Sequence, residues 1–185
     1  MVDSDSSKIL RKSPLVVIYE TFQGICNAGD ILMEQFFTDY LERFHSLHEE
    51  MKTTIKKLPQ AALDWVPGPG MNSLCVLVVH ATGAERYWIG DVACQDPSDR
   101  NRGAEFEAQG LDSEKLAQRL DQSLVYIRSA AENLRLTDLQ QNRFSSRDER
   151  KYTTGWALAH ALEHTALHLG HAQVTRQVWE QTEGR

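Results

Sequence analysis

The sequence predicts an all-α protein, a four-helix bundle, and three observations carry that prediction. Four segments repeat apolar residues every three or four positions, which places an apolar stripe on a helix. No segment shows the alternating apolar and polar pattern of a half-buried strand. The length of 185 residues fits one domain with a substantial core. Helices of comparable length in one domain point to a bundle.

The composition excludes several classes of protein. Hydrophobic residues make up 41% and charged residues 25%, as in an ordinary soluble globular protein. The formal net charge of −6 argues against a nucleic-acid partner, because such binding depends on lysine and arginine neutralising phosphates. Three scattered cysteines, Cys26, Cys75 and Cys94, suit reduced thiols and a cytoplasmic protein. No apolar run reaches the roughly 18–20 residues of a membrane span, so we expect no membrane partner.

The first helix begins after an N-terminal segment of different character. Residues 1–32 show no sustained period, so we treat them as an extension and assign residues 33–185 to the bundle domain. Met33 is also a candidate start of the natural chain. From there one apolar stripe predicts a helix over roughly 33–57, which Pro59 ends. The stripe consists of Phe37, Leu41, Phe44, Leu47, Met51, Ile55 and Leu58.

The second helix follows a segment in which proline and glycine alternate, residues 65–70. Asn72 or Ser73 is its predicted N-cap, and it should run over about 73–93. This helix is apolar nearly all round, which is typical of a helix buried on most sides, and His80 lies in its middle. The polar residues 95–110 are predicted to form a loop that crosses one end of the bundle.

The third and fourth helices carry equally clear signals. Asp112 or Ser113 caps the third, in which apolar residues recur from Leu116 to Leu134. A charged loop over 145–151 separates it from the fourth. Thr153 or Thr154 opens that helix, expected over 155–180 without an internal proline.

The fourth helix carries a stripe of four histidines. At about 100° per residue they fall within an arc of roughly 80° on one face of the helix. Histidines at positions i and i+4 lie one above the other, so both imidazoles can reach a single ion, and His164 with His168 fits that geometry. The stripe consists of His160, His164, His168 and His171.

Apolar neighbours predict that this histidine stripe faces the bundle interior. Leu167, Val174 and Val178 lie in nearly the same angular sector. A buried imidazole needs a hydrogen bond or a ligand, and His80 in its apolar helix poses the same question. A lone core histidine is usually satisfied by a carbonyl or side chain, so His80 gains weight only together with the pair.

These segments resemble the DinB-like (DinB/YfiT) superfamily. Residues 65–73, WVPGPGMNS, followed by 77–80, LVVH, and 84–88, AERYW, are similar to the loop and second helix of these proteins. Residues 164–170, HTALHLG, are similar to the closing His-x-x-x-His-x-x-Gly pattern. The resemblance covers about residues 33–180. It implies a four-helix bundle, often a homodimer, with a divalent ion on His80, His164 and His168. Zinc is the first expectation, with nickel, iron or manganese as alternatives.

Two positions depart from the superfamily pattern. Many relatives have arginine and glutamine where this chain has Leu169 and His171. Roles that those two residues play elsewhere are therefore not carried over to this chain.

Such a site suits an enzyme. Three protein nitrogens leave at least one coordination position open for water or substrate, as in catalytic zinc sites. The ion would activate water for hydrolysis or hold a thiol as thiolate for transfer. The resemblance favours a small-molecule substrate and a low-molecular-weight thiol, because some relatives are metal-dependent S-transferases. Glu163 and His171 are candidate supporting or acid–base groups, and helix solvation explains both equally well.

Three other interpretations stay open. His160, Glu163 and His164 match the His-x-x-Glu-His motif of inverted zinc metallopeptidases, although the chain leaves little room for their downstream ligand. A non-catalytic metal-binding or stress-response bundle would use the same three ligands without turnover. A bundle without any metal would be favoured if those histidines lay far apart.

Overall fold

The computed structural model describes residues 33–182, and within that range the predicted four-helix bundle is confirmed. The first long helix, α2, spans Gln35–Ile55, and the second, α4, spans Leu74–Glu85. The third, α6, spans Ser113–Glu132, and the fourth, α7, spans Thr154–Thr182. The predicted N-terminal extension, residues 1–32, lies outside the described residues. None of the helices in the described part is long and apolar enough to cross a membrane.

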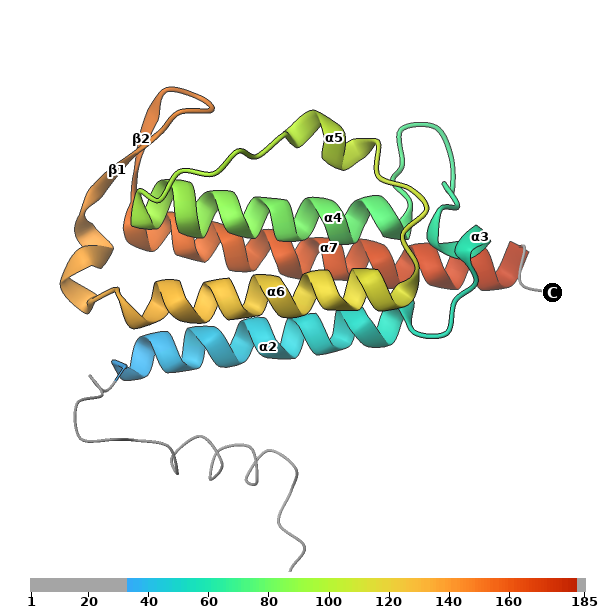
Figure 1. Ribbon diagram of the computed structural model, residues 1–185, viewed down its shortest axis with the longest axis horizontal. Coiled ribbons are helices and arrows are strands. Elements are labelled where there is room, and N and C mark those ends of the chain that lie inside the picture. Colours follow the sequence, from blue (N-terminus) through green and yellow to red (C-terminus); the bar gives the residue numbers. More distant parts are fainter. Residues whose placement is uncertain (1–32, 183–185) are drawn as a thin grey trace, which may run out of the picture. The chain divides into compact units, whose positions relative to one another are not determined.

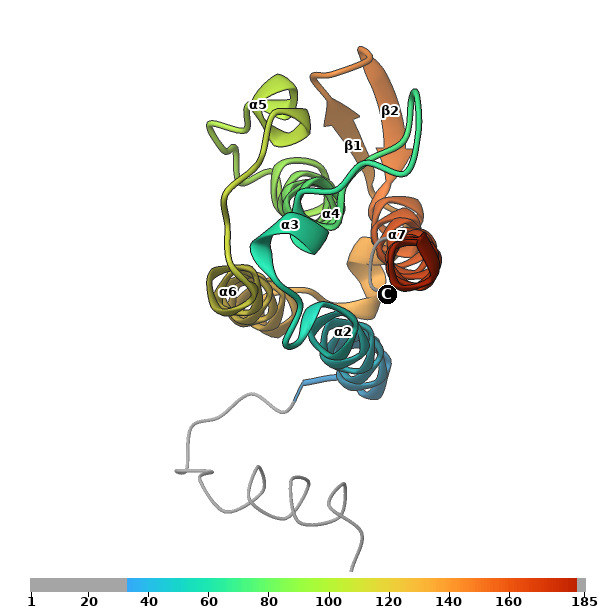
Figure 2. The ribbon, with the colours of Figure 1, turned by 90° about the vertical axis from the view of Figure 1, so that its right-hand side faces the viewer.

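The four helices form a ring in the order α2, α6, α4, α7 (Figures 1 and 2). In Figure 1, α4 and α6 run in one direction and α2 and α7 in the other. The chain therefore has to return along the bundle between α4 and α6. It does so on the outside of α4, where the short helix α5, Arg102–Phe106, packs against that helix.

That return segment corrects the sequence prediction for residues 95–110. We expected a loop across one end of the bundle, but the segment contains α5 and runs along the length of α4. The reason is topological, because two parallel neighbouring helices need a connection as long as the bundle. The side chain of Asn101 caps α5 by accepting a hydrogen bond from the amide of Ala104 at 3.1 Å.

Two further elements were not predicted. Residues Arg86–Cys94 continue α4 as a π-helix, η1. The sequence did not predict it, because apolar periodicity does not specify which hydrogen-bond register the backbone adopts. The charged segment before α7 forms an antiparallel hairpin of β1, Asn142–Ser145, and β2, Arg150–Thr153. The hydroxyl groups of Tyr87 and Ser145 lie 2.7 Å apart, which ties the hairpin to η1. Short turns of helix, α3 at Gln60–Leu63 and η2 at Leu136–Gln140, complete the fold.

The helix starts follow the predicted caps. The Ser73 hydroxyl accepts a hydrogen bond from the amide of Val76 at 3.2 Å, and the Asp112 carboxylate accepts one from Lys115 at 2.8 Å. Each cap satisfies an amide that the first turn of a helix leaves without a partner. The sequence alone did not decide between Asn72 and Ser73 for the first cap or between Asp112 and Ser113 for the second.

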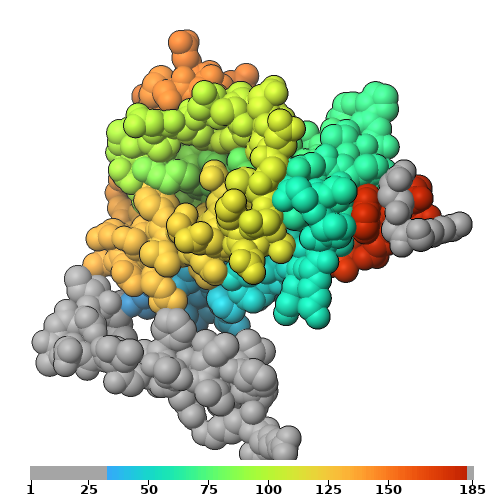
Figure 3. All heavy atoms as spheres, turned by 45° about the vertical axis from the view of Figure 1, so that its right-hand side comes forward, coloured from blue at the N-terminus to red at the C-terminus, as the bar shows by residue number. Residues whose placement is uncertain are grey.

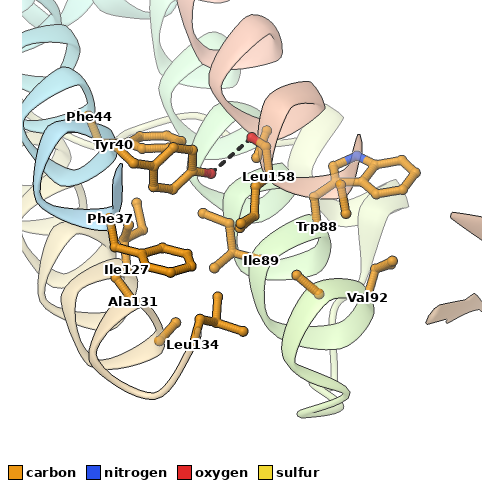
Figure 4. Close-up of a cluster of buried hydrophobic side chains, with 14 of the residues drawn as sticks. Phe37, Tyr40, Phe44, Trp88, Ile89, Val92, Ile127, Ala131, Leu134 and Leu158 are labelled. Carbon is orange, nitrogen blue, oxygen red and sulfur yellow. Dashed lines mark hydrogen bonds between the residues drawn. The ribbon is translucent and has the colours of Figure 1, made fainter. Parts of the chain in front are cut away.

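The core of one half of the bundle is aromatic and aliphatic (Figure 4). Phe37, Tyr40 and Phe44 project from α2 towards Ile89 of η1 and Leu158 of α7. The Tyr40 hydroxyl donates a hydrogen bond of 2.9 Å to the carbonyl oxygen of Leu158, so the buried phenol is satisfied. Burial raises the pKa of Tyr40 well above its ordinary value.

The four long helices also meet at a buried polar cluster. His48 of α2 and Glu85 of α4 are both 0% exposed, and their Nε2 and Oε1 atoms lie 2.9 Å apart. The hydroxyl of Thr165 on α7 donates to Glu85 Oε1 at 2.7 Å, and Ser123 of α6 donates to Glu85 Oε2. One carboxylate thus joins all four helices. The Nδ1 atom of His48 is buried without a hydrogen-bond partner.

Candidate metal centre

The three histidines that the sequence singled out lie together on two facing helices. His80 comes from the middle of α4, and His164 and His168 come from successive turns of α7. One nitrogen from each imidazole can be chosen so that all three lie within 4.8 Å of one another. The His80 ring centroid is 5.0 Å from each of the other two, so His80 faces the pair symmetrically.

The geometry of the pair suits one shared ion. The Nε2 atoms of His164 and His168 are 3.2 Å apart. Two nitrogens bound tetrahedrally to one zinc ion at about 2.0–2.1 Å lie roughly 3.3–3.4 Å apart, so the observed distance is close to that of two ligands. The donor set of three imidazoles is one that zinc, nickel and iron accept. The residues present therefore fit a divalent ion.

Burial and neighbouring histidines keep His164 and His168 neutral. Burial lowers the pKa of His164 to about 3, with the neighbouring histidines His168, His80 and His160 adding to the shift. Burial, followed by His80 and His171, lowers the pKa of His168 to about 4. A histidine must be neutral to bind a metal, so both side chains are ready to do so at neutral pH.

The histidine stripe does not face the bundle interior as predicted. Leu167 and Val174, which we expected to be buried beside it, are each 54% exposed. The face of α7 that packs into the core consists of small residues and leucines instead, among them Ala161, Thr165 and Leu169. His164 and His168 therefore lie partly buried at the edge of the contact between α7 and α4.

The remaining members of the stripe lie outside the cluster. His160 is a turn before His164, with ring centroids 5.9 Å apart, and stacks on Trp156 at 4.8 Å. His171 is exposed. Glu163 has a side chain that is 78% exposed and contacts only His160 among the described ion pairs, at 3.6 Å. The peptidase interpretation needs Glu163 beside a bound ion, and its exposure does not favour that role.

Sequence reasoning missed the hydrogen-bond partner of His80. Glu105 of α5 lies with Oε2 2.8 Å from His80 Nδ1, and the carboxylate also accepts hydrogen bonds from Arg100 at 2.6 and 2.8 Å. Burial alone would raise the pKa of Glu105, but the hydrogen bonds from His80 and Arg100 outweigh it and lower the pKa. A signal existed in Gly83, because a glycine inside a buried helix often marks the close approach of another group.

The Glu105 carboxylate also lines a pocket of about 440 Å³. Residues of α4, of the segment around Arg100 and of α6 line it, among them Gly83, Glu105 and Arg119. Figure 3 shows the surface hollowed where the green α4 lies between the yellow-green and the yellow segments. Cys75 is buried in the core and, like Cys94, lies outside the histidine cluster.

The comparisons place the chain in a family. A family model described as "Protein of unknown function (DUF1572)" matches residues 32–182. The chain belongs to the DUF1572 family. A crystal structure of a conserved protein from Enterococcus faecalis resembles the DUF1572 chain with a TM-score of 0.63 and 16% identity, covering 76% of this chain and 95% of that one. At this identity the likeness shows the fold alone. No curated protein matches the chain.

Proposed function

We propose that this DUF1572 protein binds one divalent metal ion through His80, His164 and His168. The observation that carries the proposal is the convergence of three imidazole nitrogens within 4.8 Å from two different helices. Histidines that only solvate a helix would point to solvent and would not converge between two helices. The resemblance to DinB-like proteins, which implies a three-histidine metal site, supports the same ligand set.

The proposed activity is that of a metal-dependent transferase or hydrolase. When bound, the ion would supply Lewis acidity and an open position for water or for the thiol group of a low-molecular-weight thiol. The chain's own part is to hold the three ligands in a partly buried setting and to keep His164 and His168 neutral. His160 is the candidate acid–base group, because it is part-buried one turn before His164, with ring centroids 5.9 Å apart.

Elemental analysis tests the metal site directly. We would express wild type and the His164→Ala/His168→Ala variant, offer zinc, nickel, iron(II) and manganese to each, and measure bound metal by plasma mass spectrometry. About one ion per chain is expected in wild type and none in the double variant. His171→Ala is the matched control, because it removes an exposed histidine of the same stripe. Wild type that retained no metal would refute the proposal.

A second measurement separates an enzyme from a metal-binding protein without turnover. The metal-loaded wild type would be assayed with electrophiles and low-molecular-weight thiols, and in parallel with hydrolysable esters and amides. The proposed enzyme accelerates at least one of these reactions, and the double variant does not. Tight metal binding with no rate enhancement across the whole panel would leave the non-catalytic interpretation.

A further inference from the structure

Among the three proposed ligands, only His80 has a protein partner for its second ring nitrogen. Its Nδ1 atom faces the Glu105 carboxylate at 2.8 Å, and both side chains are buried. By contrast, the Nδ1 atoms of His164 and His168 are buried without a hydrogen-bond partner. The orientation of the pair is set by the helix that carries both, whereas His80 stands alone on its own helix. His80 is therefore the ligand that most needs a second contact to fix its ring.

The Glu105 carboxylate is also bound by Arg100, in addition to His80. Arg100 donates two parallel hydrogen bonds, from Nε to Oε1 at 2.6 Å and from a terminal nitrogen to Oε2 at 2.8 Å. Such a bidentate pair fixes the plane of a carboxylate as well as its position. Phe106, the next residue of α5, lies against the His80 ring with centroids 4.6 Å apart. The return segment thus contacts His80 through two adjacent side chains.

Gly83 makes this approach possible. A Cβ atom placed on Gly83 would lie 2.1 Å from Glu105 Oε1 and 2.7 Å from its Cδ atom. Inside a helix, glycine costs about 1 kcal/mol relative to alanine, so the sequence bears a local penalty at this position. The space that it leaves is the space in which the carboxylate sits, one helical turn from His80.

We propose that Glu105 is the positioning residue of the metal centre. Arg100 holds its carboxylate through two hydrogen bonds, and the absence of a side chain at Gly83 leaves room for it. Glu105 keeps the proton of His80 on Nδ1 and turns Nε2 towards His164 and His168. Hydrogen bonds of this kind fix the tautomer of a ligand and make it a better donor, and losing them typically weakens metal binding about 10- to 100-fold. The consequence for affinity rests on the proposed metal binding, but the tautomer does not.

Two variants disturb the carboxylate by different routes. Glu105→Gln removes the charge while keeping the shape, and Gly83→Ala displaces an unaltered Glu105 by steric contact. Each has a matched control in the same part of the fold. Glu107→Gln changes an exposed glutamate two residues along, and Gly103→Ala changes a glycine of α5 whose added Cβ would meet nothing closer than 3.4 Å.

The zinc affinity of all four variants would be measured by competition with a chromogenic chelator, after circular dichroism has shown that each is folded. Glu105→Gln and Gly83→Ala should bind zinc about 10- to 100-fold more weakly than wild type, and the two controls should not change. The absorption bands of the cobalt-substituted protein should shift in the first two variants only, because they report ligand geometry rather than stability. Wild-type affinity and spectra in both variants would overturn the proposal.

A measurement on the metal-free wild type decides the same point without any variant. Long-range ¹⁵N–¹H correlation spectra distinguish an imidazole protonated at Nδ1 from one protonated at Nε2. His80 should be protonated at Nδ1, and a His80 protonated at Nε2 would overturn the inference even if zinc binds. If this tautomer is found but no metal binds to wild type, the proposed function fails while the contact between Glu105 and His80 stands.

Discussion

Replacing Glu85 by leucine should destabilise the fold strongly, because this carboxylate joins all four helices. The variant leaves the His48 imidazole and the Thr165 hydroxyl buried without the partner that they have at 2.9 and 2.7 Å. An unsatisfied buried polar group costs about 1–3 kcal/mol, and breaking a buried pair by removing one partner costs about 3–5 kcal/mol. We therefore expect a loss of about 3–5 kcal/mol, a large part of the roughly 5–15 kcal/mol that holds a domain together.

Urea unfolding followed by circular dichroism measures this loss, and a double-mutant cycle assigns it to the pair. His48→Leu alone should lower the free energy of unfolding by a similar amount, because it leaves the buried Glu85 carboxylate without its imidazole partner. The double variant His48→Leu/Glu85→Leu should cost at least about 2 kcal/mol less than the sum of the two single losses, since it leaves neither partner unpaired. Glu132→Leu, at an exposed site on α6, should change stability by about 0.5 kcal/mol or less. Additive single losses, or a Glu85→Leu loss under about 1 kcal/mol, would refute the reasoning.

Two further predictions concern the candidate metal centre. The pKa values of His164 and His168 lie below that of an ordinary histidine. As pH falls from about 6.5 towards about 4, the unfolded chain therefore binds protons at these two histidines that the folded metal-free protein does not bind. The free energy of unfolding falls over the same pH range. With a halving for partial exposure, the two together give about 1.4 kcal/mol per pH unit, and urea unfolding in chelator should show this slope in wild type but not in the double alanine variant. Separately, cobalt(II) should quench tryptophan fluorescence in wild type, because Trp88 and Trp156 both contact His160 beside the cluster. Trp156→Phe should reduce the quenching, and equal quenching in the double alanine variant would contradict a metal at this site.

The long helices were predictable from sequence because their signals are local. Periodic apolar residues define α2 and α6, and Ser73 and Asp112 satisfy amides three residues further on. The hairpin was missed because its two strands have four residues each, and Phe144, the one large apolar residue of β1, is 50% exposed. The hairpin also contacts Tyr87, 58 residues before Ser145 in the chain, and no local pattern contains such a contact.

The candidate site was also predictable where its contacts are local, and not where they join distant parts of the chain. The positions i and i+4 of His164 and His168 on one helix predicted their closeness, and the structure bears this out at 3.2 Å. The partnership of His80 with Glu105 spans 25 residues and depends on how a connection folds back, so no spacing rule reveals it. The wrong prediction that the histidine stripe faces the bundle interior had another cause. α7 is apolar or small on two adjacent faces, and sequence alone does not say which of them packs into the core.

The buried polar cluster and the candidate metal centre are connected by their positions on the same two helices. Glu85 lies five residues after His80 on α4, and Thr165 directly follows His164 on α7. The hydrogen bond between Glu85 and Thr165 therefore fixes the register of the helix pair close to the point where the histidines meet. A slip of one helical turn, about 5.4 Å, would leave that bond unmade in a fully buried place and would also separate His80 from His164. The buried interior of the bundle thus fixes the alignment of α4 and α7, and the three imidazoles meet at the edge of the contact between these two helices.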